Sequence, residues 1–286
     1  MKSSNIFREL LKKSSLVQIP GAYDCITATM VEQAGFPAVY LTGSGMSLTL
    51  TGQPDLHTVS YTEVRQVAQN IRSAVSIPML VDIDTGFGAP LNIYRLVRDF
   101  EQMDIAAVQI EDQKAPKKCG HELGRKLVEP DEMCKRIRAI VDNRGENGLV
   151  VVARTDARTS MGVDEAIRRS NIYLDAGADV IFVESPESIE EVKAIVNGVK
   201  GPILFNDVEG GRSPFLSRKQ LEEVGVKCAI YPNALTRIAC KKCPELLNTL
   251  MKEGTTESMW DQMLSHKELW SMFHHNDWVE IESKYI

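Results

Sequence analysis

Two aspartates spaced two positions apart, Asp82 and Asp84, end one short apolar run, and Glu111 follows the next run. Successive side chains of a strand alternate between its two sides, so Asp82 and Asp84 are expected on the same side. Carboxylates this close repel each other unless a cation lies between them, and a few oxygen ligands completed by water suit Mg²⁺. The spacing predicts a magnesium site at Asp82 and Asp84, joined by Glu111. The alternative is a pair of capping or salt-bridged aspartates.

A long polar connection, residues 113–126, contains the sequence KKCGH at positions 117–121. Long loops in compact domains are commonly functional. The two lysines and the histidine would surround Cys119 with positive charge, which lowers the pKa of a thiol and lets it exchange protons near neutral pH. Two glycines would let the connection move as a lid that excludes water. The alternative is an exposed basic loop with an incidental cysteine.

Further polar groups follow the other apolar runs. The segment 42–45 (TGSG) offers backbone amides and hydroxyls to an anion, although an ordinary tight turn has the same composition. Arg154 presents a planar guanidinium that grips a carboxylate at two points. Glu184 is expected either to orient a leaving fragment or to pair with Arg154. Other polar residues at equivalent places are Asp24, Asn206, Asp207, Tyr231 and Asn233.

Eight short apolar runs, each followed by an amphipathic stretch, must position these groups. Val- and Ile-rich strands buried on both faces are typical of a parallel sheet, and eight such units favour closure into a (β/α)₈ barrel of TIM type. Function in such a barrel lies at the carboxyl ends of the strands, where the polar groups occur. A doubly wound open sheet is disfavoured because no Gly-x-Gly-x-x-Gly follows the first run. The runs are 16–19, 38–41, 79–83, 106–110, 149–153, 180–183, 203–205 and 228–230.

The composition is that of an ordinary globular protein. Of the 286 residues 43% are hydrophobic and 25% charged, and the net charge is -6, which argues against nucleic acid or an anionic membrane as partner. No apolar run is long enough to span a bilayer. The six cysteines are spread too thinly for a disulfide framework, and the N-terminal segment lacks the apolar block of a secretory signal. We therefore expect a reducing, cytoplasmic location.

The last part of the chain departs from the alternating pattern. Residues 1–253 are expected to form the barrel, and residues 254–286 a C-terminal helical tail. The tail carries Trp260, Trp270 and Trp278, and so much apolar surface suggests contact with another subunit. Packing of the tail on its own barrel is the alternative.

Several segments resemble the isocitrate lyase/phosphoenolpyruvate mutase superfamily. They are residues 82–88 (DIDTGFG), 111–113 (EDQ), 116–121 (PKKCGH), 153–157 (ARTDA) and 206–211 (NDVEGG). The KKCGH motif marks the lyase branch, and the pattern is similar to that of 2-methylisocitrate lyases and 2,3-dimethylmalate lyases. The resemblance implies a barrel whose eighth helix is swapped between subunits, in a homotetramer made of two such pairs.

The resemblance also implies a reaction, the magnesium-dependent cleavage of a carbon–carbon bond in a 2-hydroxy di- or tricarboxylate. A 2-methylisocitrate-like acid would give a 2-oxo acid such as pyruvate and a dicarboxylate such as succinate. In this retro-aldol or Claisen-type cleavage, Cys119 would protonate the departing carbanion and Arg154 would stabilise the developing oxygen charge. Tyr40 would help remove the hydroxyl proton, and Lys117 completes the implied catalytic set. Mn²⁺ is the alternative to Mg²⁺.

The implied binding residues form two sets. The metal would be held by Asp82 and Asp84, with Glu111, Asp55 and Asp112 acting through waters. The substrate would be held by Thr42, Gly43, Ser44, Gly120, His121, Glu184 and Asn206. Two segments differ from the family pattern, 205–207 (FND) and 231–237 (YPNALTR), and they leave the substrate's side chain open. The alternatives are oxaloacetate decarboxylation or hydrolysis, a phosphonate (carboxyphosphonoenolpyruvate or phosphoenolpyruvate) mutase, and a barrel that binds a metabolite without catalysis.

Overall fold

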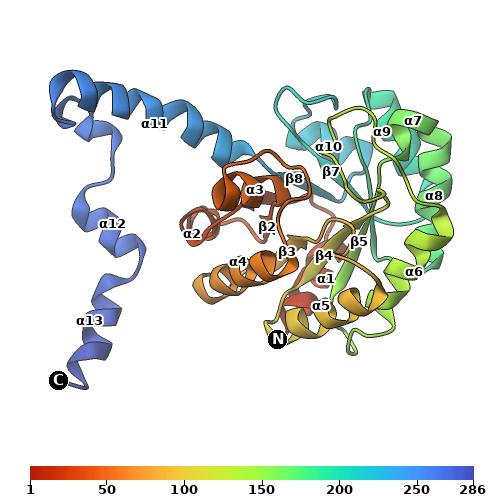
Figure 1. The fold of residues 1–286 in the computed structure, drawn as a ribbon, viewed down its shortest axis with the longest axis horizontal. Helices are drawn as coiled ribbons and strands as arrows, with labels where there is room; N and C mark the ends of the chain where they lie inside the picture. Colours follow the sequence, from red (N-terminus) through yellow and green to blue (C-terminus); the bar gives the residue numbers. More distant parts are fainter. The chain divides into compact units, whose positions relative to one another are not determined.

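The computed structural model describes residues 1–286, which form two compact units, Met1–Leu235 and Thr236–Ile286. The first unit is built on a closed barrel of parallel strands that are paired in chain order, β8 completing the circle against β1 (Figure 1). The predicted barrel is confirmed, and each strand overlaps its predicted run. The strands are β1 Val17–Ala22, β2 Val39–Leu41, β3 Met79–Asp82, β4 Ala107–Glu111, β5 Val150–Thr155, β6 Val180–Val183, β7 Ile203–Asn206 and β8 Cys228–Tyr231.

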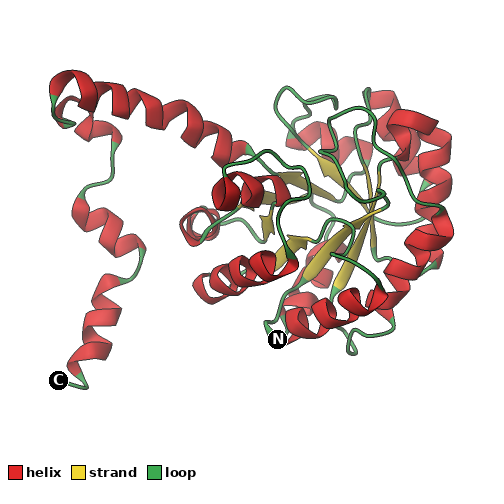
Figure 2. Ribbon diagram, viewed as in Figure 1, coloured by secondary structure: helices red, strands yellow, loops and turns green.

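Helices alternate with these strands and lie outside them, as Figure 2 shows. Gly35 and Gly177, at φ 82° and 105°, follow the ends of α2 and α8, where a left-handed residue terminates a helix without strain. None of the helices combines the length and the apolar character needed to cross a membrane. The helices of this unit are α1 Ser3–Lys12, α2 Cys25–Gln33, α3 Gly43–Thr51, α4 Tyr61–Ala74, α5 Pro90–Gln102, α6 Pro130–Val141, α7 Ala157–Met161, α8 Val163–Asp175, α9 Ile189–Gly198 and α10 Arg218–Val224.

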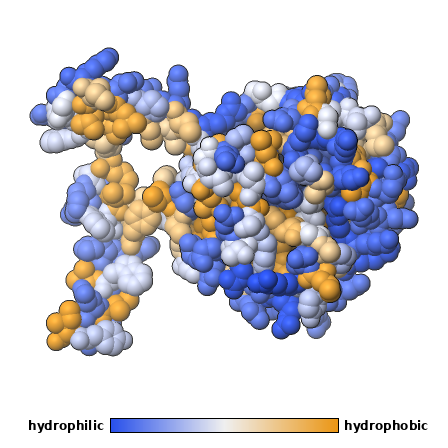
Figure 3. Space-filling model, viewed as in Figure 1, coloured by the Kyte–Doolittle hydropathy of each residue, from blue (hydrophilic) through white to orange (hydrophobic).

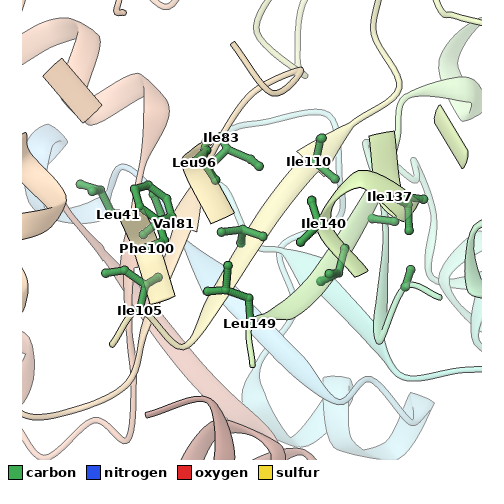
Figure 4. Close-up of a cluster of buried hydrophobic side chains, with 14 of the residues drawn as sticks. Leu41, Val81, Ile83, Leu96, Phe100, Ile105, Ile110, Ile137, Ile140 and Leu149 are labelled. Carbon is green, nitrogen blue, oxygen red and sulfur yellow. The ribbon is translucent and has the colours of Figure 1, made fainter. Parts of the chain in front are cut away.

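An apolar layer between the strands and the helices fixes the barrel wall. Leu96 and Phe100 of α5 are fully buried, and they belong to the same cluster as Val81 of β3 and Ile110 of β4 (Figure 4). Helix α5 therefore buries the face that its apolar spacing predicts. Because both faces of each strand are covered, the ends of the strands are the places where polar side chains can gather.

A second cluster fills the barrel interior and is closed at one end by α1. Phe7 of α1 is fully buried among residues that begin strands, including Val17, Val150 and Val180. Helix α1 thus covers the amino-terminal end of the barrel. The carboxyl-terminal end is left for chemistry, as is usual in this architecture.

The second unit is helical and largely exposed. It comprises most of α11 Ala234–Glu253, a 3₁₀ turn at Glu257–Gln262, α12 His266–Met272 and α13 His275–Ser283. Trp260 and Trp278 are 65% and 68% exposed, and Figure 3 shows apolar side chains at the surface of this segment. The predicted role of residues 254–286 in subunit contact stays a prediction.

Candidate active site

A small cavity of about 50 Å³ lies at the carboxyl ends of the strands. Ligand sites usually enclose roughly 300 Å³ or more, so the segment over the cavity must move before a substrate of several carbons can enter. That segment is the predicted lid, because Cys119, Gly120 and His121 form part of the wall. The other predicted site residues that line the cavity are Tyr40, Thr42, Ser44, Asp55, Asp82, Arg154, Glu184 and Asn206.

Acidic side chains gather at one corner of this cavity, where Asp55 and Asp82 line it and Asp84 lies behind them. The Asp84 N–H donates to Asp82 Oδ1 over 3.0 Å, and Lys117 Nζ lies 2.6 Å from Asp55 Oδ1 and 2.8 Å from Asp84 Oδ1. Asp84 lies beyond the end of β3 with φ 48°. A turn, and not strand alternation as predicted, therefore brings its carboxylate beside that of Asp82. A Cβ on Gly43 would lie 2.8 Å from Asp82 Oδ2, so a glycine is needed where α3 begins.

The acidic corner has the donor chemistry of a divalent-cation site. Both carboxylate oxygens of Glu111 are buried without a hydrogen-bond donor. Burial, followed by the charge of Asp84, raises the pKa of Asp82 to about 6, and burial also raises the pKa of Glu111 well above its ordinary value. A cation bound here would stabilise the ionised forms of Asp82 and Glu111, and oxygen donors suit Mg²⁺. In this arrangement no three acidic, His or Cys side chains converge on one point. The Lys117 ammonium instead supplies a positive charge to the carboxylate of Asp84.

Arg154 lines the cavity beside Glu111. Its guanidinium lies 5.2 Å above the Phe182 ring and contacts Asp156 at 2.9 Å and 3.1 Å and both Glu111 and Glu184 at 3.3 Å. Burial alone would lower the pKa of Arg154, but the three carboxylates outweigh it and raise that pKa well above its ordinary value. A fixed positive charge in a buried cavity stabilises an oxygen that becomes negative during a reaction.

The thiol of Cys119 faces the same cavity, but its pKa is raised. Burial is the largest cause and the charges of Asp55 and Glu184 add to it, against a hydrogen bond from the His121 backbone. The predicted lowering of the thiol pKa was wrong, because burial outweighs the groups that lower it. A neutral thiol remains able to donate a proton.

The remaining carboxylate-binding candidates lie together beside Arg154. Asn206 Nδ2 is 3.3 Å from Glu184 Oε2 and 3.5 Å from His121 Nε2. The lid backbone comes so close here that a Cβ on Gly120 would lie 2.5 Å from Glu184 Oε2. Only glycine can occupy this position without displacing Glu184.

Tyr40 holds the acidic corner from inside the barrel. Its hydroxyl is 3.1 Å from Asp82 Oδ2 and 3.2 Å from Gln109 Oε1. Burial and the charge of Asp82 raise the pKa of Tyr40 well above its ordinary value. A phenol that keeps its proton donates hydrogen bonds to these two side chains, and the role of Tyr40 in removing a hydroxyl proton stays a prediction.

The segment 42–45 is neither a free loop nor an isolated turn. Thr42 is the N-cap of α3, and Gly43, Ser44 and Gly45 form its first turn. Thr42 and Ser44 both line the cavity. The Gly45 N–H donates to the Thr42 side chain, and the predicted binding of an anion by this helix start stays a prediction.

Asp112 lies outside the cavity, contrary to its predicted role through water. Its carboxylate accepts hydrogen bonds from Thr155 Oγ1 at 2.7 Å, from the Tyr173 hydroxyl at 2.8 Å and from the Asp156 N–H at 3.0 Å. Arg169 of α8 lies 3.3 Å from the same carboxylate. Asp112 thus fixes the segment after β5, because the residue next to Glu111 must face the other side of the strand.

Two residues near Arg154 were not assigned from the sequence. Asp156 binds Arg154 and also Arg125 of the lid, with 2.5 Å between Asp156 Oδ1 and Arg125 Nη1. Asp156 belongs to the ARTDA segment, so its motif was visible although its role was not. The role of Arg125 could not be predicted from the sequence, because its neighbours in the chain are loop residues that are exposed in the structure.

Comparison with known proteins agrees with this arrangement over most of the chain. The family model described as phosphoenolpyruvate phosphomutase matches residues 7–251. The chain is 42% identical over 285 residues to 2,3-dimethylmalate lyase of Eubacterium barkeri, covering 100% of this chain and 99% of that protein. It is 41% identical over 276 residues to 2-methylisocitrate lyase of Halalkalibacterium halodurans, covering 96% and 91%.

Solved structures show the same likeness. Oxaloacetate acetylhydrolase in complex with 3,3-difluorooxalacetate has a TM-score of 0.93 and 31% identity, covering 99% of this chain and 97% of that one. Phosphonopyruvate hydrolase in complex with oxalate and Mg²⁺ has a TM-score of 0.90 and 27% identity, covering 100% and 99%. The chain therefore belongs to the phosphoenolpyruvate mutase/isocitrate lyase superfamily of enzymes.

Proposed function

We propose that this enzyme cleaves a carbon–carbon bond in a 2-hydroxy di- or tricarboxylate and releases a 2-oxo acid such as pyruvate and a dicarboxylate such as succinate. The observation that carries the proposal is one cavity with a neutral thiol, Cys119, and a buried guanidinium, Arg154, beside an acidic corner. Two relatives at 42% and 41% identity bear the names of such lyases.

Asp82 and Asp84 would hold Mg²⁺, or Mn²⁺ in its place, with Asp55 and Glu111 around them. A bound divalent ion would neutralise negative charge on the substrate's 2-oxygen and neighbouring carboxylate. Glu111 supports this assignment, since its buried oxygens accept no hydrogen bond and only one of them has a cation nearby, Arg154 at 3.3 Å. Lys117, which lies between Asp55 and Asp84, would shift away from the corner or share it.

The bond cleavage can be balanced with residues of the cavity. Tyr40, which lines the cavity, would help to remove the proton of the 2-hydroxyl group and pass it to solvent. The bond from the 2-carbon to its neighbour breaks, the 2-carbon becomes the carbonyl of the oxo acid, and the electron pair remains on the departing carbon, delocalised into its carboxylate. Cys119 donates its proton to that carbon, and the proton taken from the 2-hydroxyl group is returned to the thiol through solvent. Arg154 stabilises the negative oxygen throughout.

The substrate's carboxylates would bind at two places. The first turn of α3, with Thr42, Gly43 and Ser44, offers amide and hydroxyl donors to the oxo-acid carboxylate. His121 and Asn206 would donate to the carboxylate of the other fragment. Glu184 orients them, since it contacts Asn206 and Arg154.

The same proposal includes an assembly. The first unit carries an apolar depression of about 390 Å³ on its surface, and the second unit exposes tryptophans. We propose that copies of the chain exchange their C-terminal helical segments and form a homotetramer of two such pairs. The depression is lined by Pro20, Met30, Val31, Ala34, Phe36 and Leu235, among others.

The activity is tested by incubating the protein and Mg²⁺ with 2-methylisocitrate, 2,3-dimethylmalate, isocitrate and oxaloacetate in turn. Formation of a 2-oxo acid from one of the hydroxy acids, abolished by a chelator and by Cys119→Ser, is the expected result. The second candidate is oxaloacetate hydrolysis, which the TM-score of 0.93 to an oxaloacetate acetylhydrolase favours. Consumption of oxaloacetate alone, undiminished in Cys119→Ser, would replace the lyase by that hydrolase.

A further inference from the structure

The lid is the connection of residues 113–127 between β4 and α6. An antiparallel bridge between Gln113 and Leu127 closes its base. The Gln113 side chain also binds the Lys118 backbone, donating to its carbonyl and accepting from its N–H, both over 2.9 Å. These contacts lie within the lid, so they give it a shape but do not attach its tip to the barrel.

Arg125 adds a buried attachment of the tip to the barrel, beside the pairs of Lys117 with Asp55 and Asp84 and a hydrogen bond from Ser185 Oγ to the Gly120 carbonyl over 3.0 Å. The Arg125 side chain is only 3% exposed, although its neighbours in the chain are exposed. Nη1 donates to the Gly120 carbonyl and to Asp156 Oδ1, and Nη2 lies 2.5 Å from Thr159 Oγ1 of α7. One guanidinium therefore binds the tip of the lid and the barrel at the same time.

Asp156 is a fixed point of the barrel. Its N–H donates to the buried carboxylate of Asp112 over 3.0 Å. Its own carboxylate receives Arg154 Nε at 3.1 Å and Nη2 at 2.9 Å, together with Arg125. Two arginines, one from the lid and one from the cavity wall, thus share a single buried carboxylate.

We propose that Arg125 is a positioning residue that latches the lid shut and sets Cys119 and Arg154 in their working places together. Arg125 does not line the cavity. It acts on Cys119 through the adjacent Gly120 carbonyl and on Arg154 through Asp156. When the lid opens, Arg125 leaves with it and Arg154 alone holds Asp156. The inference rests on the proposed function only for the role of Cys119 as proton donor.

The latch is tested first without any substrate, by the rate at which iodoacetamide labels Cys119. Trypsin cleaves after Lys118 and Arg125, so the cysteine is followed by mass spectrometry in its own peptide, residues 119–125. In Arg125→Ala the peptide extends to Lys126. We expect Arg125→Ala to be labelled about 10–100-fold faster, because charge-assisted hydrogen bonds that close the lid are lost. The exposed Cys240 serves as the internal reference and should keep its rate.

Matched variants separate the latch from a general loss of structure. Lys126→Ala removes the adjacent cation, which has an exposed side chain, and should be labelled like the wild type. Thr159→Ala removes one barrel partner without touching the lid, and Arg125→Lys retains the charge but loses the forked geometry. In both variants Cys119 should be labelled faster than in the wild type and more slowly than in Arg125→Ala. Thermal midpoints close to that of the wild type show that each variant is folded.

Turnover supplies the second measurement. With whichever substrate the panel identifies, Arg125→Ala should lower kcat about 10–100-fold while KM changes by less than about threefold, because closing follows binding. Wild-type labelling of Cys119 in folded Arg125→Ala, or equal effects in Lys126→Ala, would overturn the latch. If no substrate is cleaved, the labelling result still decides the latch, and only the proposed function fails.

Discussion

At the scale of single residues, burial decides which groups carry a proton. Cys119 is buried near two carboxylates, so its thiol stays neutral, whereas Arg154 stays charged because three carboxylates surround it. The cavity therefore offers a proton and a fixed positive charge at the same time. This pairing favours a reaction in which an oxygen becomes negative while a carbanion is quenched.

Replacing the thiol tests this assignment. Cys119→Ser should reduce kcat about 10²–10⁴-fold, the usual contribution of general acid catalysis, and leave Mg²⁺ binding measured by calorimetry unchanged. Cys25→Ser is the matched control, because Cys25 is a partly buried cysteine at the start of α2. It should retain wild-type turnover, and equal turnover of both variants would remove Cys119 from the mechanism.

The pH profile gives an independent check. A thiol acid loses its proton as the pH rises, and a pKa above its ordinary value of 9.0 moves that loss to higher pH. We therefore expect the alkaline limb of kcat to lie above pH 9. A limb near pH 7 would show that the thiol is activated and not held neutral.

Asp207, the extra carboxylate after β7, gives a prediction for stability. The residue is 1% exposed, and burial together with Glu209 raises its pKa to about 6, against a backbone hydrogen bond from Leu216. A raised folded-state pKa stabilises the protonated form, so stability is lost as the pH rises from about 4 through 6. Asp207→Asn should remove that loss. Its thermal midpoint relative to wild type should rise between pH 5 and pH 8 by roughly 2–4 °C.

The control for this prediction is Glu223→Gln on α10, whose side chain is 61% exposed. It should show no such pH-dependent difference. A constant offset between Asp207→Asn and the wild type across the same range would mean that Asp207 does not titrate there.

At the scale of elements, α8 supports the active site from behind. Its buried face carries Arg169 and Tyr173, which hold Asp112, and Asp112 in turn holds the backbone of Asp156. The apolar residues of this helix, such as Ile167, are only partly buried. The buried face of α8 is therefore partly polar. Its ion pair with Asp112 positions Asp156, which binds both Arg154 and the lid.

Breaking that ion pair should be costly. Arg169→Leu would leave the Asp112 charge buried without its partner, and such a loss destabilises a protein by about 3–5 kcal/mol. Arg168→Leu, the neighbour whose side chain is 55% exposed, is the matched control and should leave the thermal midpoint unchanged. Equal midpoints for the two variants would show that Asp112 is solvated or protonated in the folded protein.

The elements themselves were readable from the sequence, whereas several side-chain roles were not. The eight strands followed from short apolar runs because burial on both faces leaves a pattern of its own. The direction of Asp112 and the pairing of Lys117 depend on neighbours that are distant in the chain. The latch at Arg125 depends on a contact across 31 positions to Asp156, which no local pattern reveals.

At the scale of the whole molecule, the exposed apolar side chains of the second unit require an explanation. Trp270 and Trp278 are 46% and 68% exposed on two separate helices. Isolated exposed apolar residues are ordinary, but several on one short segment are typical of an interface. The proposed exchange of C-terminal segments would bury them.

Sedimentation measures this assembly directly. We expect the wild type to sediment at about four times the mass of the 31.9 kDa chain. The double variant Trp270→Glu/Trp278→Glu should dissociate to smaller species, because buried charges without partners oppose association. Lys267→Glu, an exposed change on the same helix as Trp270, should leave the mass unaltered. A wild-type monomer would contradict the proposed tetramer.

The helix that closes the amino-terminal end of the barrel has a consequence for biosynthesis. Ser3 binds Asp104, Ser4 binds the Asn147 carbonyl and Arg8 binds the Gly148 carbonyl. Helix α1 therefore has no docking site until about 140 further residues have left the ribosome. At about 5–20 residues per second, this leaves its apolar face, with Phe7, unprotected for roughly 7–30 s. During that interval the nascent chain offers a sequence for chaperones to hold, and a bulky fusion placed directly before Ser3 should slow maturation more than one placed after Ile286.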